Sequence, residues 1–133
     1  MDMSNSGLAG RRVFLIEDES LVAMLIEDAL TELGCEIAGV ASRFGEAMEK
    51  TKSLSFDVAI LDLDLNGQRT LPIAEILLDR EIPFVFATGY GATDLAAALQ
   101  GVPILAKPFQ QRDLERALCA AIAPHISADG RDC

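Results

Sequence analysis

Four short apolar runs constrain the fold of this chain, because each of them ends directly at a polar or charged residue. The residues that follow the runs are Glu17, Asp62, Thr88 and Lys107. Short apolar runs with polar boundaries are typical of buried parallel strands. In an open α/β sheet, ligands bind beyond the carboxyl ends of such strands. We therefore expect the acids, the hydroxyl and the ammonium group to meet at one edge of one sheet.

Alternating strands and helices are predicted along the chain. The predicted strands cover residues 13–16, 36–41, 57–61, 84–87 and 104–106. The predicted helices begin near residues 20, 44, 72, 93 and 111. A strand followed by a helix, five times over, predicts an α/β fold with a doubly wound, five-stranded parallel sheet and helices on both faces. We expect one domain over residues 10–124, with flexible tails at 1–9 and 125–133.

Apolar residues recur at helical spacing in the first and last predicted helices, and we expect them to face the core. In the first helix they are Leu21, Val22, Leu25, Ile26, Ala29, Leu30 and Leu33. In the last helix they are Leu114, Ala117, Leu118 and Ala121. Ser20 is a candidate N-cap of the first helix, and Gly34 is suited to end it.

Charge and hydropathy exclude several classes of function. A formal net charge of −10 over 133 residues repels a phosphate backbone, so we expect no binding to nucleic acid. No apolar stretch approaches the roughly 20 residues of a membrane-spanning helix, and residues 1–10 lack the apolar core of a signal peptide. We therefore expect a cytoplasmic protein that does not bind membranes.

The three cysteines and the single histidine suggest no site of their own. Cys35, Cys119 and Cys133 lie far apart and have no CxxC spacing. We interpret them as buried or incidental thiols rather than a disulfide framework or a zinc site. His125 lies beside Pro124, and nothing nearby completes a metal site.

Acidic residues at two strand ends indicate a metal site. Glu17, Asp18 and Asp62 should lie at neighbouring strand ends, where their negative charges repel one another. A hard cation relieves this repulsion, and Mg²⁺ prefers oxygen ligands. Asp64 follows in the next loop, where its backbone carbonyl is placed to add a ligand. The alternative is that the acids at 17–19 only favour the start of the first helix, but the matching polar residues at the other strand ends argue against it.

Asp62, Thr88 and Lys107 together favour phosphoryl chemistry. A carboxylate can accept a phosphoryl group covalently when a metal ion neutralises the charge. The Thr88 hydroxyl can donate to a phosphoryl oxygen, and Gly89 beside it allows a close backbone approach. Lys107 supplies a positive charge, and an ammonium group at the end of a buried strand is costly to leave unpaired.

Taken in order, these motifs resemble those of response-regulator receiver domains, the CheY-like phosphoacceptor modules of two-component signalling. The motifs are FLIEDE at 14–19, AILD at 59–62, ATG at 87–89 and AKPF at 106–109. The resemblance covers residues 10–123 and implies a flavodoxin-like fold. The site that it implies consists of Asp62 as phosphoacceptor, Glu17, Asp18, Asp62 and the Asp64 carbonyl as Mg²⁺ ligands, and Thr88 and Lys107 as partners of the phosphoryl oxygens.

The resemblance also implies the partners. The phosphoryl group would come from the phosphohistidine of a sensor histidine kinase or a histidine phosphotransfer protein, and would later be lost by hydrolysis. The chain would not be an enzyme beyond this self-catalysed transfer and dephosphorylation. No output domain is expected after Pro124, so we expect a single-domain response regulator that signals through protein contacts; the downstream target is not indicated.

The sequence departs from the family pattern in three places. Ile104 stands where the family usually has a switch aromatic, so the usual threonine–tyrosine coupling is not expected, and Tyr90 is a candidate substitute. Asn66-Gly67 replaces a frequent proline after the phosphoacceptor and should loosen that loop. The run FATGY at 86–90 resembles a receiver subgroup with a Phe-Ala-Thr-Gly signature, associated with a distinct class of sensor histidine kinases.

Two other functions remain open from the sequence. Asp62 and Asp64 after an apolar strand also resemble the nucleophile motif of haloacid-dehalogenase-type phosphatases. Those enzymes carry further aspartates downstream of the lysine, whereas here the acids lie upstream and Asp113 falls within a predicted helix. A phosphorylation-independent binding module is the second alternative, and the complete set of site residues argues against it.

Overall fold

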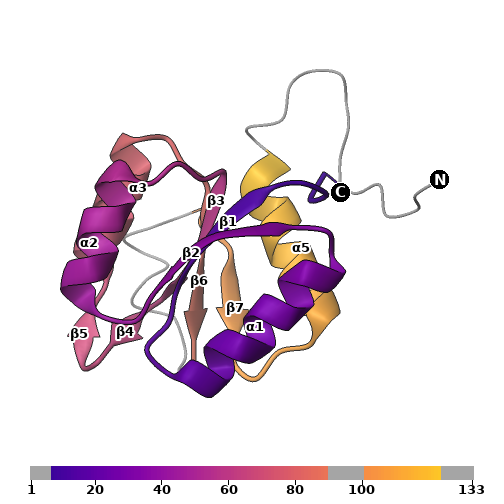
Figure 1. Cartoon of the computed structure of the whole chain (residues 1–133), viewed down its shortest axis with the longest axis horizontal. Coiled ribbons are helices and arrows are strands. Elements are labelled where there is room, and N and C mark those ends of the chain that lie inside the picture. Colours follow the sequence, from indigo (N-terminus) through magenta and orange to yellow (C-terminus); the bar gives the residue numbers. More distant parts are fainter. Residues whose placement is uncertain (1–6, 90–100, 124–133) are drawn as a thin grey trace.

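A sheet of five parallel strands forms the centre of the protein (Figure 1). The structure, a computed structural model, describes residues 7–89 and 101–123. The strands are β1 (Arg12–Ile16), β2 (Glu36–Ala41), β3 (Val58–Asp62), β6 (Phe84–Thr88) and β7 (Ile104–Ala106). Their order across the sheet is β2-β1-β3-β6-β7, and every neighbouring pair is parallel. The predicted doubly wound α/β fold is confirmed.

Helices cover both faces of this sheet (Figure 1). The helices are α1 (Ser20–Glu32), α2 (Phe44–Ser53), α3 (Leu71–Asp79) and α5 (Gln111–Ile122). The helices α1 and α5 share one apolar cluster, and α2 and α3 share the other. The helix predicted to begin near residue 93 lies outside the described residues.

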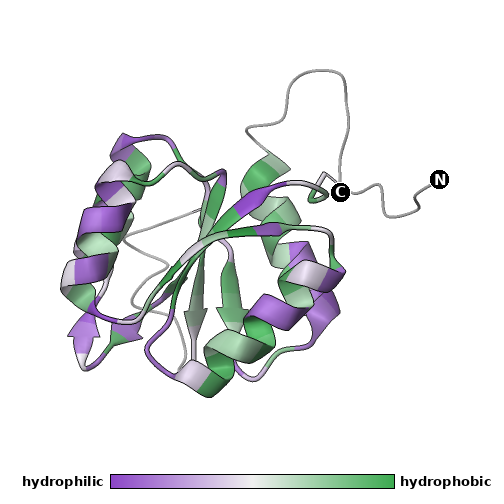
Figure 2. Ribbon diagram, in the orientation of Figure 1, coloured by the Kyte–Doolittle hydropathy of each residue, from purple (hydrophilic) through white to green (hydrophobic). Residues whose placement is uncertain are grey.

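The core has two layers because the strands send alternate side chains to opposite faces. In β1, Val13 and Leu15 belong to the cluster under α1 and α5, whereas Phe14 and Ile16 belong to the cluster under α2 and α3. Every residue of β3 and β6 is buried, and apolar residues predominate in the central strands (Figure 2). Strands of this kind need cover on both faces, which the two helical layers supply.

Fewer residues of α1 face the core than predicted. Ile26 and Leu30 are buried, but Leu21 and Leu25 are 67% and 62% exposed. One face of a helix contacts a sheet over a stripe of residues three and four apart, and Leu21 and Leu25 lie to the side of the stripe that runs through Ala23, Ile26 and Leu30. The prediction is therefore wrong for these two leucines, whereas all four predicted inner residues of α5 are buried.

The two ends of α1 differ in how well they were predicted. Glu19, not Ser20, is the N-cap, and it makes no side-chain capping hydrogen bond. At the other end, Gly34 has a φ of 89°. Its N–H donates to Thr31 O, and Cys35 N–H donates to Leu30 O, both at 3.0 Å. This pair of bonds is the Schellman ending, which confirms the predicted role of the glycine.

An unpredicted hairpin follows β3. The strands β4 (Asp64–Leu65) and β5 (Gln68–Arg69) pair antiparallel across Asn66 and Gly67. Both turn residues have positive φ, at 53° and 85°. Such a two-residue turn favours asparagine followed by glycine, because both residues tolerate this conformation. The prediction of a loose loop is therefore wrong, since Asn66-Gly67 forms a tight turn.

Part of the predicted N-terminal tail packs against the fold. Leu8 is fully buried, and its carbonyl accepts a hydrogen bond from Arg11 N–H at 3.0 Å. Residues 1–6 and 124–133, which hold most of the two predicted tails, lie outside the described residues. Within the described ranges, no helix is both long and apolar enough to cross a membrane.

One of the two described cysteines differs from its prediction. Cys35 is a free, buried thiol, and burial raises its pKa to about 11. Cys119, in α5, is disulfide-bonded. The interpretation of Cys119 as an incidental thiol is therefore wrong, because sequence spacing alone does not show which cysteines approach each other.

The unequal burial along α1 gives a paired prediction. Leu30→Ala should lower the free energy of unfolding by about 2–5 kcal/mol, since it leaves a cavity in the core. Leu25→Ala should change it by no more than about 0.5 kcal/mol, because that side chain is largely in solvent. Urea unfolding of the two variants and the parent measures both values. Equal costs would mean that α1 packs on the sheet through a different face.

Candidate functional site

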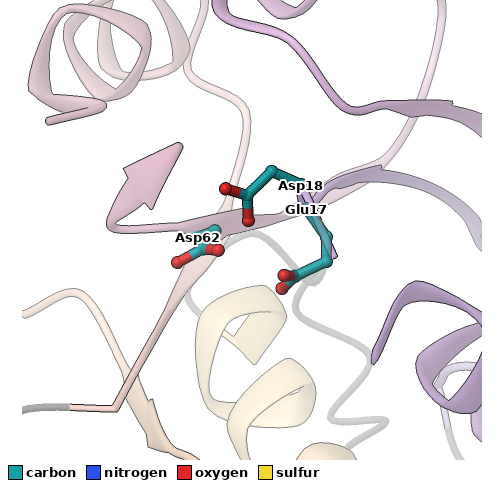
Figure 3. Close-up of side chains that lie close together, drawn as sticks. All are labelled: Glu17, Asp18 and Asp62. Carbon is teal, nitrogen blue, oxygen red and sulfur yellow. The ribbon is translucent and has the colours of Figure 1, made fainter. Parts of the chain in front are cut away.

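Three carboxylates meet at the carboxyl edge of the sheet (Figure 3). Glu17 and Asp18 follow β1, and Asp62 ends β3. The two strands are neighbours, with Ile16 opposite Leu61, so the residues that follow lie side by side. One carboxylate oxygen from each of the three acids lies within 4.8 Å of the others. The predicted convergence of the acids is thus present.

Lys107 reaches this cluster from the end of the edge strand β7. It follows β7, and its backbone N–H donates to Thr88 O at 2.9 Å. Its Nζ lies 2.9 Å from Glu17 Oε1 and 3.4 Å from Asp62 Oδ2. One ammonium group therefore bridges two buried carboxylates that come from two other strands.

An open cavity of about 550 Å³ lies over the cluster. It is lined by Asp18, Glu19, Asp62, Asp64, Gly67, Thr88, Gly89 and Lys107. Every site residue expected from the sequence lines this cavity except Glu17, which is 2% exposed and forms an ion pair with Lys107. Asp62 is 7% exposed, so its carboxylate is partly shielded but still reaches the cavity wall.

The electrostatics of the cluster oppose ionisation of Asp62. Burial, together with the negative charge of Glu17, raises its pKa to about 7 from an ordinary value of 3.8. The nearby Lys107 ammonium opposes this shift without cancelling it. For Lys107, burial favours the neutral form, but the hydrogen bond to Glu17 and the two carboxylate charges outweigh it and raise the pKa. The site thus holds more negative charge than one lysine neutralises.

Asp64 lies on the rim of the site. Its backbone N–H donates to Asp62 Oδ1 at 3.3 Å. Its carboxylate is 3.3 Å from Arg69 Nε, the residue opposite it in the hairpin. The side chain is therefore turned toward the hairpin, and the backbone of Asp64 is held next to the Asp62 carboxylate.

Thr70 is a site residue that the sequence analysis missed. It is fully buried, and its hydroxyl lies 2.6 Å from Asp62 O and 3.1 Å from Leu63 O. Its N–H also donates to Leu63 O at 2.9 Å. A threonine two residues before a proline indicates only the start of a helix. The neighbouring sequence therefore does not show that the Thr70 hydroxyl bonds to the backbone at Asp62 and Leu63.

A second cavity of about 550 Å³ adjoins the site along α1. Its lining includes Val22 and Leu25 of α1, together with Pro108 and Phe109 after β7. Glu19 and Lys107 line both cavities. The exposed Leu25 of α1 therefore lines a cavity that is continuous with the carboxylate site.

The switch position is described only in part. Ile104, in the edge strand β7, is 39% exposed. Thr88 is buried at the end of β6, opposite Ala106 of β7. Tyr90, the candidate substitute for the switch aromatic, lies outside the described residues.

Comparisons with known proteins agree on one family. A family model described as "Response regulator receiver domain" matches residues 13–119. The chemotaxis protein CheY of Thermotoga maritima is 32% identical over 114 residues, which cover 82% of this chain and 95% of CheY. The structure of SdrG from Sphingomonas melonis Fr1 is similar with a TM-score of 0.75 and 35% identity, covering 85% of this chain and 97% of SdrG.

A longer protein contains a similar domain. The response regulator PhyR from Brucella abortus matches with a TM-score of 0.78 and 28% identity. The match covers 92% of this chain but 51% of PhyR. The chain therefore spans about half the length of that relative.

The raised pKa of Asp62 predicts a pH-dependent stability. In the metal-free protein, Asp62 is protonated when folded and ionised when unfolded between pH 3.8 and about 7. Its contribution is complete below the unfolded pKa and is lost as pH rises through the folded pKa. Asp62→Asn should therefore stabilise the protein by about 1–3 kcal/mol at pH 8, and by less at pH 5. Urea unfolding in the presence of a chelator measures the free energy of unfolding at each pH. An equal gain in stability at pH 8 and pH 5 would contradict the raised pKa of Asp62.

The Thr70 hydroxyl predicts a second stability effect. Thr70→Val keeps the shape but removes the donor to a buried carbonyl, which should cost about 1–3 kcal/mol. Thr70→Ser keeps the hydroxyl and loses one methyl group, which should cost about 1 kcal/mol or less. The two variants are compared by chemical denaturation. If valine is tolerated as well as serine, the hydroxyl does not stabilise the loop.

Proposed function

Because the chain belongs to the response regulator receiver domain family, we propose that it accepts a phosphoryl group on Asp62 and signals through the change that follows. The observation that carries this proposal is the surroundings of the Asp62 carboxylate. It lines an open cavity and lies 3.4 Å from Lys107 Nζ. A partly desolvated nucleophile beside a fixed positive charge suits attack on a phosphoryl group.

In the proposed reaction, the residues of this chain position the reactants. An ionised Asp62 oxygen attacks phosphorus as the bond to the donor nitrogen breaks. Lys107 contributes a positive charge next to the oxygens of the incoming group. Thr88 borders the same cavity, where its hydroxyl can donate to one of these oxygens. Their fixed positions at strand ends reduce the reorganisation that the transfer requires.

A divalent cation completes the proposed site. Glu17, Asp18, Asp62 and the carbonyl of Asp64 would hold Mg²⁺, which favours oxygen ligands. The donor set fits such an ion, since three carboxylates approach within 4.8 Å and a single lysine bridges only two of them. When bound, the ion would supply positive charge that neutralises the acceptor and the phosphoryl oxygens.

The donor in this proposal is a phosphohistidine on a helix of a sensor histidine kinase or a histidine phosphotransfer protein. Leu21, Met24 and Leu25 of α1 are each more than half exposed. Leu25 lines the cavity that shares Glu19 and Lys107 with the carboxylate site. A partner helix packed on these apolar residues would therefore place its histidine close to Asp62. We propose that the phosphoryl transfer takes place in the cytoplasm.

The signalling step is proposed to involve Thr88 and the segment that follows it. Phosphorylation would draw the Thr88 hydroxyl toward the phosphoryl group and bias two arrangements of similar energy. The helix predicted near residue 93 lies outside the described residues, so its part in the change rests on the sequence alone. We also propose membership of the subgroup with the Phe-Ala-Thr-Gly signature, supported by the run at 86–89.

Intact mass after incubation with a small phosphodonor tests the proposed function. The wild-type chain with Mg²⁺ should gain one phosphoryl group, whereas Asp62→Asn should gain none. Removal of Mg²⁺ with a chelator should abolish the gain in the wild type. Asp64→Asn is the matched control, because it removes a nearby carboxylate that is not the proposed acceptor. A gain that persists in Asp62→Asn would contradict the proposal.

A further inference from the structure

Asn66 connects three segments that lie far apart in the sequence. It occupies the first position of the turn between β4 and β5, with a φ of 53°. Its backbone N–H donates to Asp18 Oδ2 at 2.8 Å. Its side-chain Nδ2 donates to Ser42 O at 3.1 Å, in the connection between β2 and α2. One residue of the hairpin thus holds the segments that follow β1 and β2.

These two hydrogen bonds have different consequences. The first holds Oδ2 of the Asp18 carboxylate, and an oxygen of the same carboxylate lies within 4.8 Å of Glu17 and Asp62. The second fixes the hairpin that carries the donor. Leu65, which precedes it, is fully buried, so the core fixes one end of this peptide, whereas Asn66 itself is exposed. On the exposed side of the turn, the side-chain bond to Ser42 O restrains Asn66.

We propose that Asn66 is a positioning residue for the cation site, which it preorganises by holding the Asp18 carboxylate in one orientation. This inference rests on the proposed function, because it assumes that Asp18 is a ligand of Mg²⁺. Groups that hydrogen-bond to metal-binding side chains orient them, and their loss weakens metal binding by about 10- to 100-fold. An unrestrained Asp18, which is only partly buried, has to be ordered when the ion binds.

The test measures Mg²⁺ binding by calorimetry in the full chain. Asn66→Gly is the informative change, because glycine keeps the positive φ and the N–H but loses the bond to Ser42. We expect its Mg²⁺ dissociation constant to rise about tenfold. Gln68→Ala is the matched control, since it alters an exposed residue of the same hairpin. Its dissociation constant should stay within about twofold of the wild-type value.

Amide hydrogen exchange without Mg²⁺ provides a readout independent of the ion. The N–H of residue 66 should exchange faster in Asn66→Gly than in the wild type and in Gln68→Ala. Unchanged Mg²⁺ affinity in Asn66→Gly, equal weakening in Gln68→Ala, or unchanged exchange at residue 66 would each overturn the inference. Failure of the wild type to bind Mg²⁺ would instead contradict the proposed function, and the role of Asn66 with it.

Discussion

The ammonium group of Lys107 lies between two buried carboxylates, 2.9 Å from Glu17 and 3.4 Å from Asp62. Without it, two negative charges would be buried side by side with no counter-charge, which is strongly unfavourable. The parallel sheet makes the contact feasible because it brings the carboxyl ends of β1, β3 and β7 to one edge. The rest of the site is arranged around this partial balance of charge.

The balance is incomplete, and that gives the site its chemical character. Asp18 adds a third carboxylate, and the pKa of Asp62 rises to about 7. A purely structural ion-pair network would be expected to match its charges more closely. Excess negative charge beside an open cavity is suited to binding a cation, and to binding an anionic group whose charge that cation neutralises. The Thr70 hydroxyl bonds to the Asp62 carbonyl, and Asn66 N–H donates to the Asp18 carboxylate, so the segment after β3 is held next to this charge.

The sequence predicted most of the fold because its strands are short apolar runs with clear polar ends. The strands β2 and β7 begin and end at the predicted residues. The predicted site residues also converge, since the ends of parallel strands share one edge. Burial of Leu21 and Leu25 was overestimated because helical periodicity does not reveal how wide a face the sheet covers. The contacts of Asn66 and Thr70 were not predicted because they are made with main-chain groups or with residues distant in sequence. No local pattern encodes such partners.

The most direct test of the account is the stoichiometry and affinity of Mg²⁺ binding to the wild-type chain and to Asp18→Asn, measured by calorimetry at pH 8. We predict a single Mg²⁺ in the wild type and an affinity at least about tenfold lower in Asp18→Asn, because that change removes a charged ligand without altering its size. No binding to the wild type, or equal binding to both proteins, would contradict the claim that the excess negative charge at this edge of the sheet forms a cation site.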